Sequence, residues 1–171
     1  MFKACITSCL LLLVFCSTAL ADLEHIIHFK LSLGGYQLGM SYDEATLIRP
    51  FAFIEDLAPR AGIPEIKAGY VSQVFIDDIE FRFKVELVEG QVHKVIGRLA
   101  PTDLDKLRLA LNQALGQSEA DTKLFTSSAG EEYHLYHDRW QFPAAALDLI
   151  GSELNADYAT LALTATGRQD R

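Results

Sequence analysis

Residues 79–87 read Ile-Glu-Phe-Arg-Phe-Lys-Val-Glu-Leu, and this stretch decides the fold class. Five apolar residues alternate with four charged ones in strict period two. That pattern is typical of a strand with one face on a core and the other in water. Asp77-Asp78 before it and Glu89-Gly90 after it favour tight turns. The sequence therefore predicts an antiparallel meander of three strands, over residues 69–76, 79–88 and 91–99.

Two helices are predicted, one on each side of this meander. Ser41 and Glu44 have the spacing of a capping box, which indicates a helix over residues 42–49. The second helix is expected to begin at the cap Thr102 and to end at Gly116. Its apolar residues recur at helical spacing: Leu104, Leu107, Leu111, Ala114 and Leu115.

The rest of the chain gives weaker patterns. Further strands are expected over residues 25–33, 132–136 and 158–164. Residues 50–66 contain three prolines and indicate a connection. Residues 143–150 fit either a short helix or a strand, and we favour a strand with a bulge at Pro143. A second bulge is expected at Val95-Ile96, where two apolar residues are adjacent.

Together these elements predict an α+β fold. It has two layers, an antiparallel sheet of five to seven strands with both helices packed on one face, which leaves the other face at least partly free. Residues 22–171 have the length of a single domain. No internal repeat stands out in the sequence.

Residues 1–21 have the features of a cleaved signal peptide. Lys3 precedes an apolar run over residues 10–15, and Ala19-Leu20-Ala21 fits a signal peptidase site. We expect the mature chain to begin at Asp22 and to be periplasmic or secreted. The apolar run is too short for a typical membrane span, so an uncleaved anchor is the less favoured alternative.

Cysteine and charge narrow the class further. Cys5, Cys9 and Cys16 all lie in the expected leader, so the mature chain would have no disulfide and no thiol. Without Lys3, 14 basic side chains face 23 acidic ones, which gives a net charge of −9. No basic cluster longer than two residues occurs, which argues against nucleic acid and anionic lipid as partners. No cofactor and no catalytic residue is predicted.

Two histidines carry the main catalytic alternative. His134 and His137 are three residues apart, which on a helix would suggest a zinc site. We assign the segment to a strand, where this spacing places the two rings on opposite faces. No metal ligand is therefore predicted, unless a turn at His137-Asp138 brings the rings together with acids such as Glu131.

A partner-binding site is expected at the only tryptophan. Trp140 has Arg139 beside it and aromatic neighbours at Tyr136 and Phe142. Tryptophan, tyrosine and arginine are the residue types that dominate protein interfaces. We predict that these four residues bind a partner and that Trp140 is partly exposed. The alternative is a core tryptophan.

Residues 39–45 read Gly-Met-Ser-Tyr-Asp-Glu-Ala. This segment resembles the start of the first helix in the outer-membrane small lipoprotein A group and in the related β-lactamase-inhibitor-like modules. The resemblance implies an exported helix-on-sheet domain that binds proteins or peptidoglycan without catalysis. The chain differs from the lipoproteins because it has no acylated cysteine after its leader.

The leading functional prediction is a non-enzymatic binding or adaptor domain of the bacterial cell envelope, whose partner is a protein or another envelope component. The alternative is a metal-dependent or acid/base hydrolase that uses the His134 and His137 region. A third possibility is a sheet-lined pocket for a small apolar ligand, because the chain contains ten phenylalanines and six tyrosines.

Overall fold

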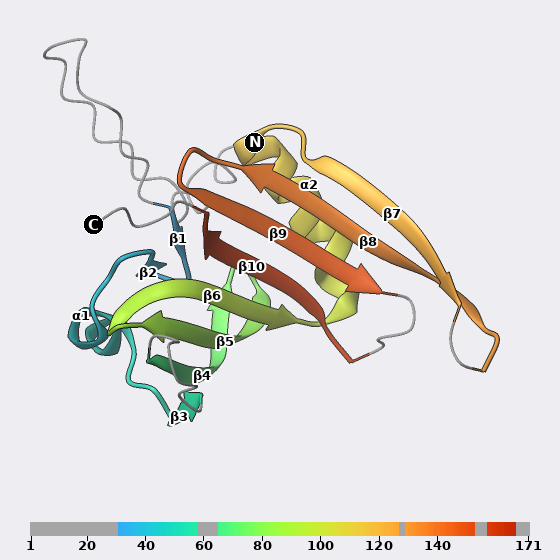
Figure 1. The fold of residues 1–171 in the computed structure, drawn as a ribbon. Coiled ribbons are helices and arrows are strands. Elements are labelled where there is room, and N and C mark those ends of the chain that lie inside the picture. The colour runs from blue at the N-terminus through green and yellow to red at the C-terminus, as the bar shows by residue number, and fades with distance from the viewer. Residues whose placement is uncertain (1–30, 58–64, 127–128, 153–156, 167–171) are drawn as a thin grey trace, which may run out of the picture.

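The computed structural model describes residues 31–57, 65–126, 129–152 and 157–166. Eight strands form one antiparallel sheet in the order β3-β4-β5-β6-β10-β9-β8-β7 (Figure 1). Their bounds are β3 Phe53–Leu57, β4 Ile66–Ile76, β5 Ile79–Val88, β6 Gln91–Leu99, β7 Glu119–Thr126, β8 Glu132–Gln141, β9 Ala145–Ser152 and β10 Ala159–Ala165. The predicted leader and most of the predicted strand 25–33 lie outside the described residues.

Smaller elements precede and interrupt the sheet. A two-stranded hairpin is formed by β1, Ser32–Leu33, and β2, Tyr36–Gln37. The α-helices of the described residues are α1, Tyr42–Ile48, and α2, Leu104–Leu115. A 3-10 turn, η2, spans Pro101–Asp103 just before α2.

The predicted α+β fold with five to seven strands is wrong, because the described chain is mostly β with eight strands in its main sheet. In the main sheet, the strands that sequence reasoning missed are the two edge strands, and the short β2 of the hairpin was also not predicted. β3 lies in the predicted connection 50–66, and β7 lies in a stretch assigned to no element. Every residue of β7 and four of the five in β3 are exposed. An edge strand that buries neither face shows no alternation, so a search for apolar alternation does not detect it.

The sheet consists of two halves with the same topology. In each half a helix is followed by a four-stranded meander: α1 by β3 to β6, and α2 by β7 to β10. The last strands of the two halves, β6 and β10, pair antiparallel at the centre (Figure 1). Counted inward from either edge, the strands of each half therefore follow one another in sequence order. This arrangement is that of an approximate two-fold axis between β6 and β10, which relates the two halves. This structural repeat was not visible in the sequence.

The two faces of the sheet differ in what covers them. On the face that we call the covered face, α2 lies over β8 to β10, where Leu104 contacts Gly151. Over the other half of this face, Tyr36 of the β1–β2 hairpin contacts Phe83, and the Phe51 ring lies against Gly69. The opposite face, which we call the open face, carries the charged residues of β5.

Local predictions around the meander are mostly confirmed. The strand over residues 79–88 alternates between buried and more exposed residues. Asp77 and Asp78 have φ angles of 47° and 64°, and Glu89 and Gly90 have φ of 50° and 78°, as two-residue hairpin turns require. The pairing of β5 with β6 shifts between Glu86 and Leu87, where His93 of β6 is the extra residue. The predicted bulge therefore lies in the expected strand, but at His93 and not at Val95-Ile96.

Residues 145–152 form a strand, but Pro143 does not form a bulge in it. Pro143 lies in the turn between β8 and β9, where the Phe142 amide donates to the Ala145 carbonyl at 2.8 Å. Proline has no amide hydrogen to contribute to a sheet, so a turn accommodates it better than the interior of a strand does.

The helix ends are confirmed in part. The Glu44 amide donates to Ser41 Oγ at 3.3 Å, and the Ser41 amide donates to Glu44 Oε2 at 2.8 Å, which is the predicted capping box. Gly116 ends α2 with φ of 88°. Thr102 is not the cap of α2, because it lies within the 3-10 turn that precedes the helix.

Candidate functional site

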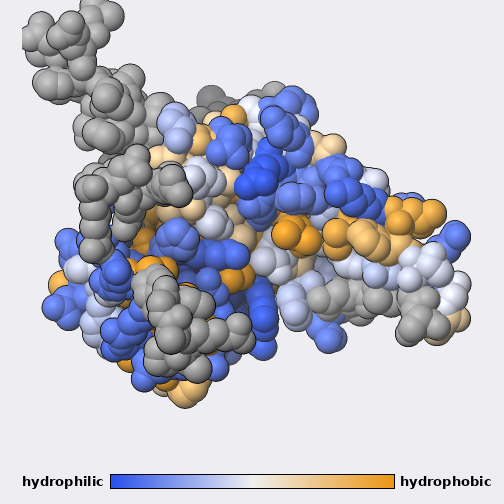
Figure 2. Space-filling model, viewed as in Figure 1, coloured by the Kyte–Doolittle hydropathy of each residue, from blue (hydrophilic) through white to orange (hydrophobic). Residues whose placement is uncertain are grey.

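The open face is a surface that the strands of the main sheet build together. Its side chains form rows across the sheet, because directly paired residues project from the same face. One row crosses six neighbouring strands from β5 to β7 and consists of Arg82, Arg98, Thr160, Ile150, His137 and Asp121. All six residues are at least partly exposed. Figure 2 shows the molecule from the side on which β8 and β9 lie in front of α2. Polar and apolar side chains are mixed on this side, with an apolar band toward the β7–β8 end.

Exposed aromatic pairs lie at both edges of the open face. Phe53 of β3 contacts Tyr70 of β4, with 5.5 Å between ring centroids. At the other edge Phe125 of β7 stacks on Tyr133 of β8 at 5.8 Å. Phe53 is 59% exposed and Phe125 is 41% exposed. Large aromatic rings left in water on an otherwise well-packed domain are typical of a protein-binding surface.

Between these edges the open face carries paired charges. Lys84 Nζ lies 2.8 Å from Glu86 Oε1, and this hydrogen bond raises the pKa of Lys84. The Tyr70 hydroxyl donates to Glu55 Oε2 at 2.7 Å, which raises the pKa of Tyr70. The carboxylates of Glu55 and Glu86 thus each have a partner on the open face.

In the other half, Asp148 joins two basic groups on the open face. Its Oδ1 lies 2.7 Å from His137 Nε2 and 3.5 Å from Arg139 Nε. Asp148 comes from β9, and the other two residues come from β8, with Arg139 directly opposite Asp148. The carboxylate thus lies within ion-pair distance of both groups, and its contact with His137 orients the histidine ring, whereas Arg139 Nε forms no hydrogen bond.

The structure separates the four residues expected to bind a partner. Arg139 projects from the open face, whereas Tyr136 and Trp140 project from the covered face. Phe142 is partly buried against the core cluster. The Tyr136 ring lies 5.8 Å from the guanidinium carbon of Arg108, which belongs to α2.

Trp140 is a core residue, so the predicted partial exposure is wrong. Its side chain is only 4% exposed, and its indole nitrogen donates to the Gly116 carbonyl at 2.9 Å. The indole thereby satisfies the carbonyl at the end of α2 and packs α2 against β8. Sequence alone does not separate this role from a binding role, because both favour a tryptophan among aromatic neighbours.

The two histidines lie on opposite faces, as strand geometry predicts. His137 belongs to the open face, and His134 projects with Tyr136 on the other face, with 6.2 Å between the two ring centroids. The pair cannot hold one ion between them. Among the described residues, no group of three or more histidine, cysteine, aspartate or glutamate side chains could hold a metal ion.

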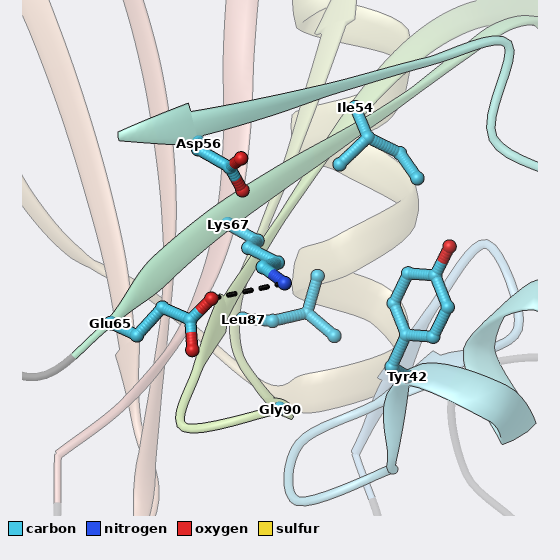
Figure 3. Close-up of a pocket in the computed structure, with 7 residues that line it drawn as sticks. All are labelled: Tyr42, Ile54, Asp56, Glu65, Lys67, Leu87 and Gly90. Carbon is cyan, nitrogen blue, oxygen red and sulfur yellow. Dashed lines mark ion pairs between the residues drawn. The ribbon is translucent and has the colours of Figure 1, made fainter. Parts of the chain in front are cut away.

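A pocket of about 570 Å³ lies beside α1, between β3, β4 and the turn after β5 (Figure 3). Its lining residues are Tyr42, Ile54, Asp56, Glu65, Lys67, Leu87 and Gly90. Lys67 Nζ pairs with Glu65 Oε1 at 3.0 Å, and this hydrogen bond raises the pKa of Lys67. The described lining is thus mixed, and Lys67 within it is already paired. The third possibility, a sheet-lined pocket for a small apolar ligand, stays a prediction.

Sequence reasoning missed the edge aromatics. Phe53 lies in the predicted connection and Phe125 in an unassigned stretch, so neither received a role. The available signal was a phenylalanine in each of two short, charge-rich stretches that flank strong strand patterns.

No protein-family model, curated protein or solved structure matches this chain. The resemblance of residues 39–45 to envelope proteins therefore stays a prediction. No helix among the described residues is long and apolar enough to cross a membrane.

Proposed function

We propose that this chain is an exported, non-enzymatic binding or adaptor domain of the bacterial cell envelope, periplasmic or secreted, that docks a partner protein on its open face. One observation carries the proposal: an eight-stranded sheet is packed on one face, whereas its other face presents exposed aromatic pairs at both edges. Arginine and aromatic side chains on a rigid sheet are effective anchors, since little conformational freedom is lost when they bind.

The docking test uses a photo-reactive benzoylphenylalanine placed at single positions in cells that produce the protein. Phe53 is the test position and Leu109 of α2 is the matched control, because their exposed fractions are 59% and 61%. We expect a discrete cross-linked product from position 53 and none from position 109. Cross-linking from position 109 alone, or from neither position, would contradict the proposed docking face.

Export has its own test. N-terminal sequencing of the protein recovered from outside the cytoplasm is expected to begin at Asp22. A mature protein that begins at Met1 contradicts the cleaved leader but leaves the docking surface untouched.

The alternative, a metal-dependent or acid/base hydrolase, draws on one contact. His137 and Asp148 form a histidine–carboxylate pair, which is a common part of acid/base sites. His134 projects from the opposite face and cannot act with His137 on one substrate, so we favour the binding function. Stoichiometric zinc that stays with the purified chain after dialysis would favour the hydrolase instead.

A further inference from the structure

Two arginines face each other at the centre of the first half of the open face. Arg82 of β5 and Arg98 of β6 are directly paired in the register, and both are exposed. Like charges placed directly opposite each other across two strands destabilise a sheet. The two arginines are nevertheless paired in this chain, in which acidic residues outnumber basic ones.

Neither arginine has an acidic partner among the described residues, although acids lie nearby. Glu86 is paired with Lys84, and Glu55 accepts the hydrogen bond of Tyr70. Glu80 is two residues from Arg82 on the same face, and the ion pairs of the described residues do not include one between them. Among the described residues, the two guanidinium groups thus have no ion-pair partner, whereas Glu55 and Glu86 each have one contact of their own.

A contact restrains Arg98, and an irregular strand lies beside Arg82. The Arg98 guanidinium carbon lies 4.5 Å from the centroid of the Tyr158 ring, a cation–π contact that restricts its motion. On the other side of Arg82, β4 has a register shift between Val71 and Val74. Within it Gln73 has φ of 58°, a conformation that costs energy in a residue other than glycine. Bulges of this kind occur beside functional sites, where they redirect side chains.

We propose that Arg82 and Arg98 form a carboxylate-binding site that receives an acidic side chain of the docked partner. The proposal rests on the proposed docking function and names the chemistry of the segment that docks. Two guanidinium forks suit a planar carboxylate, which accepts two parallel hydrogen bonds from each fork. The net negative charge of the chain repels an extended polyanion, so a short acidic segment fits better than a nucleic acid does.

The test is an NMR titration of the mature chain with an acetylated pentaglutamate peptide at low ionic strength. Pentaglutamine of the same length is the neutral control. We expect pentaglutamate to shift the amide and Nε signals of Arg82 and Arg98, and pentaglutamine to leave them unchanged. Shifts that map elsewhere, or that both peptides produce equally, would overturn the site.

Variants separate the site from the total charge of the protein. Loss of a charge-assisted hydrogen-bonded pair weakens binding by about tenfold or more, so Arg82→Ala and Arg98→Ala should each raise the Kd for pentaglutamate by that factor. Arg49→Ala removes the same charge from the exposed end of α1 and should leave the Kd nearly unchanged. Equal weakening in all three variants would overturn the site in favour of a non-specific charge effect.

Stability provides a second readout. Because the arginines repel each other, Arg82→Ala should leave the melting temperature unchanged or raise it. If Arg82 were a purely structural residue, its replacement would lower the melting temperature.

The docking proposal and the carboxylate-site proposal can be contradicted separately. If position 53 still cross-links while pentaglutamate does not bind, the carboxylate site is wrong and the docking face stands. If pentaglutamate binds at the arginines but position 53 does not cross-link, the docking face is wrong.

Discussion

The two halves of the sheet have the same topology but different cores. In the first half, Tyr36 stacks on Phe51 at 6.2 Å, and Phe81 stacks on Phe83 at 5.5 Å, so aromatic rings fill the space beside the short helix α1. In the second half, the longer helix α2 supplies leucines to the core, and an ion pair between the partly exposed Arg108 and the buried Asp138 joins it to the sheet. One backbone arrangement is therefore stabilised in two chemically different ways.

The same contrast extends to the open face. The first half presents Arg82 and Arg98, which have no ion pair within the described part of the chain, whereas His137 and Arg139 of the second half converge on Asp148. A symmetric scaffold with different side chains on its two halves can present a directional surface to a partner. The comparison shows that the repeat sets the shape of the face, whereas the individual residues set its pattern of charge.

The largest expected effect is in the aromatic core. Phe83 is 2% exposed and contacts both Phe81 and Tyr36. Phe83→Ala should lower the free energy of unfolding by about 3–5 kcal/mol, measured by urea denaturation, because it leaves a large cavity. Its neighbour Arg82→Ala, on the open face, should not lower the free energy of unfolding, and any change should stay within about 0.5 kcal/mol. Comparable losses would mean that the faces are assigned wrongly.

The next effect distinguishes the ion pairs of the two halves. Asp138 of β8 is buried, with Oδ2 2.6 Å from Arg108 Nε and Oδ1 3.0 Å from Ser118 Oγ. Arg108→Ala leaves that buried carboxylate without its charged partner and should cost about 3 kcal/mol. Lys84→Ala breaks a more exposed pair on the open face and should cost less than about 1 kcal/mol.

A double variant sharpens this result. Replacing both members of the buried pair, as in Arg108→Met with Asp138→Leu, should recover most of the loss, since no buried charge is left unpaired. If the double variant is no more stable than Arg108→Ala, packing rather than charge joins α2 to the sheet.

Two glycines on the covered face offer a finer comparison. A Cβ at Gly97 would lie 2.8 Å from Phe83 Cε1, an atom of a rigid ring, whereas at Gly151 it would meet the flexible end of Leu104 at 2.5 Å. Overpacking against a core that cannot yield costs about 1–3 kcal/mol, so Gly97→Ala should approach that range. Gly151→Ala should cost less, because Leu104 can change rotamer. Thermal unfolding of both variants gives the order, and a reversed order would contradict the account of the two cores.

The sequence predicted the centre of the fold well and its edges poorly. The alternation around Phe83 and the capping box at Ser41 are local patterns, and both are confirmed. β3 and β7 are held mainly by backbone pairing to one neighbour, so their side chains record no buried face. The same reason hid Phe53 and Phe125, and the burial of Trp140 depends on α2, which is distant in sequence.

The smallest expected effect is a pH dependence specific to the first half. Burial raises the pKa of Tyr36 above its ordinary value of 10.0, because the phenolate is disfavoured there. The unfolded chain ionises first, so this contribution to stability is complete below pH 10.0 and decreases as the pH rises through that value toward the higher native pKa. Tyr36→Phe should flatten the decline in unfolding free energy between about pH 9 and 11. An unchanged slope would contradict the assignment.

The central claim is that one face of the sheet is packed and the other is open for binding. The most direct test compares two single cysteines in β10, the strand at the centre of the sheet, in a chain that begins at residue 22 and has no cysteine of its own. Ala159 faces the covered side and is 2% exposed, whereas its neighbour Thr160 belongs to the open face. Iodoacetamide should alkylate Thr160→Cys rapidly and Ala159→Cys only as fast as the protein unfolds. Equal rates, or faster reaction at position 159, would contradict the account.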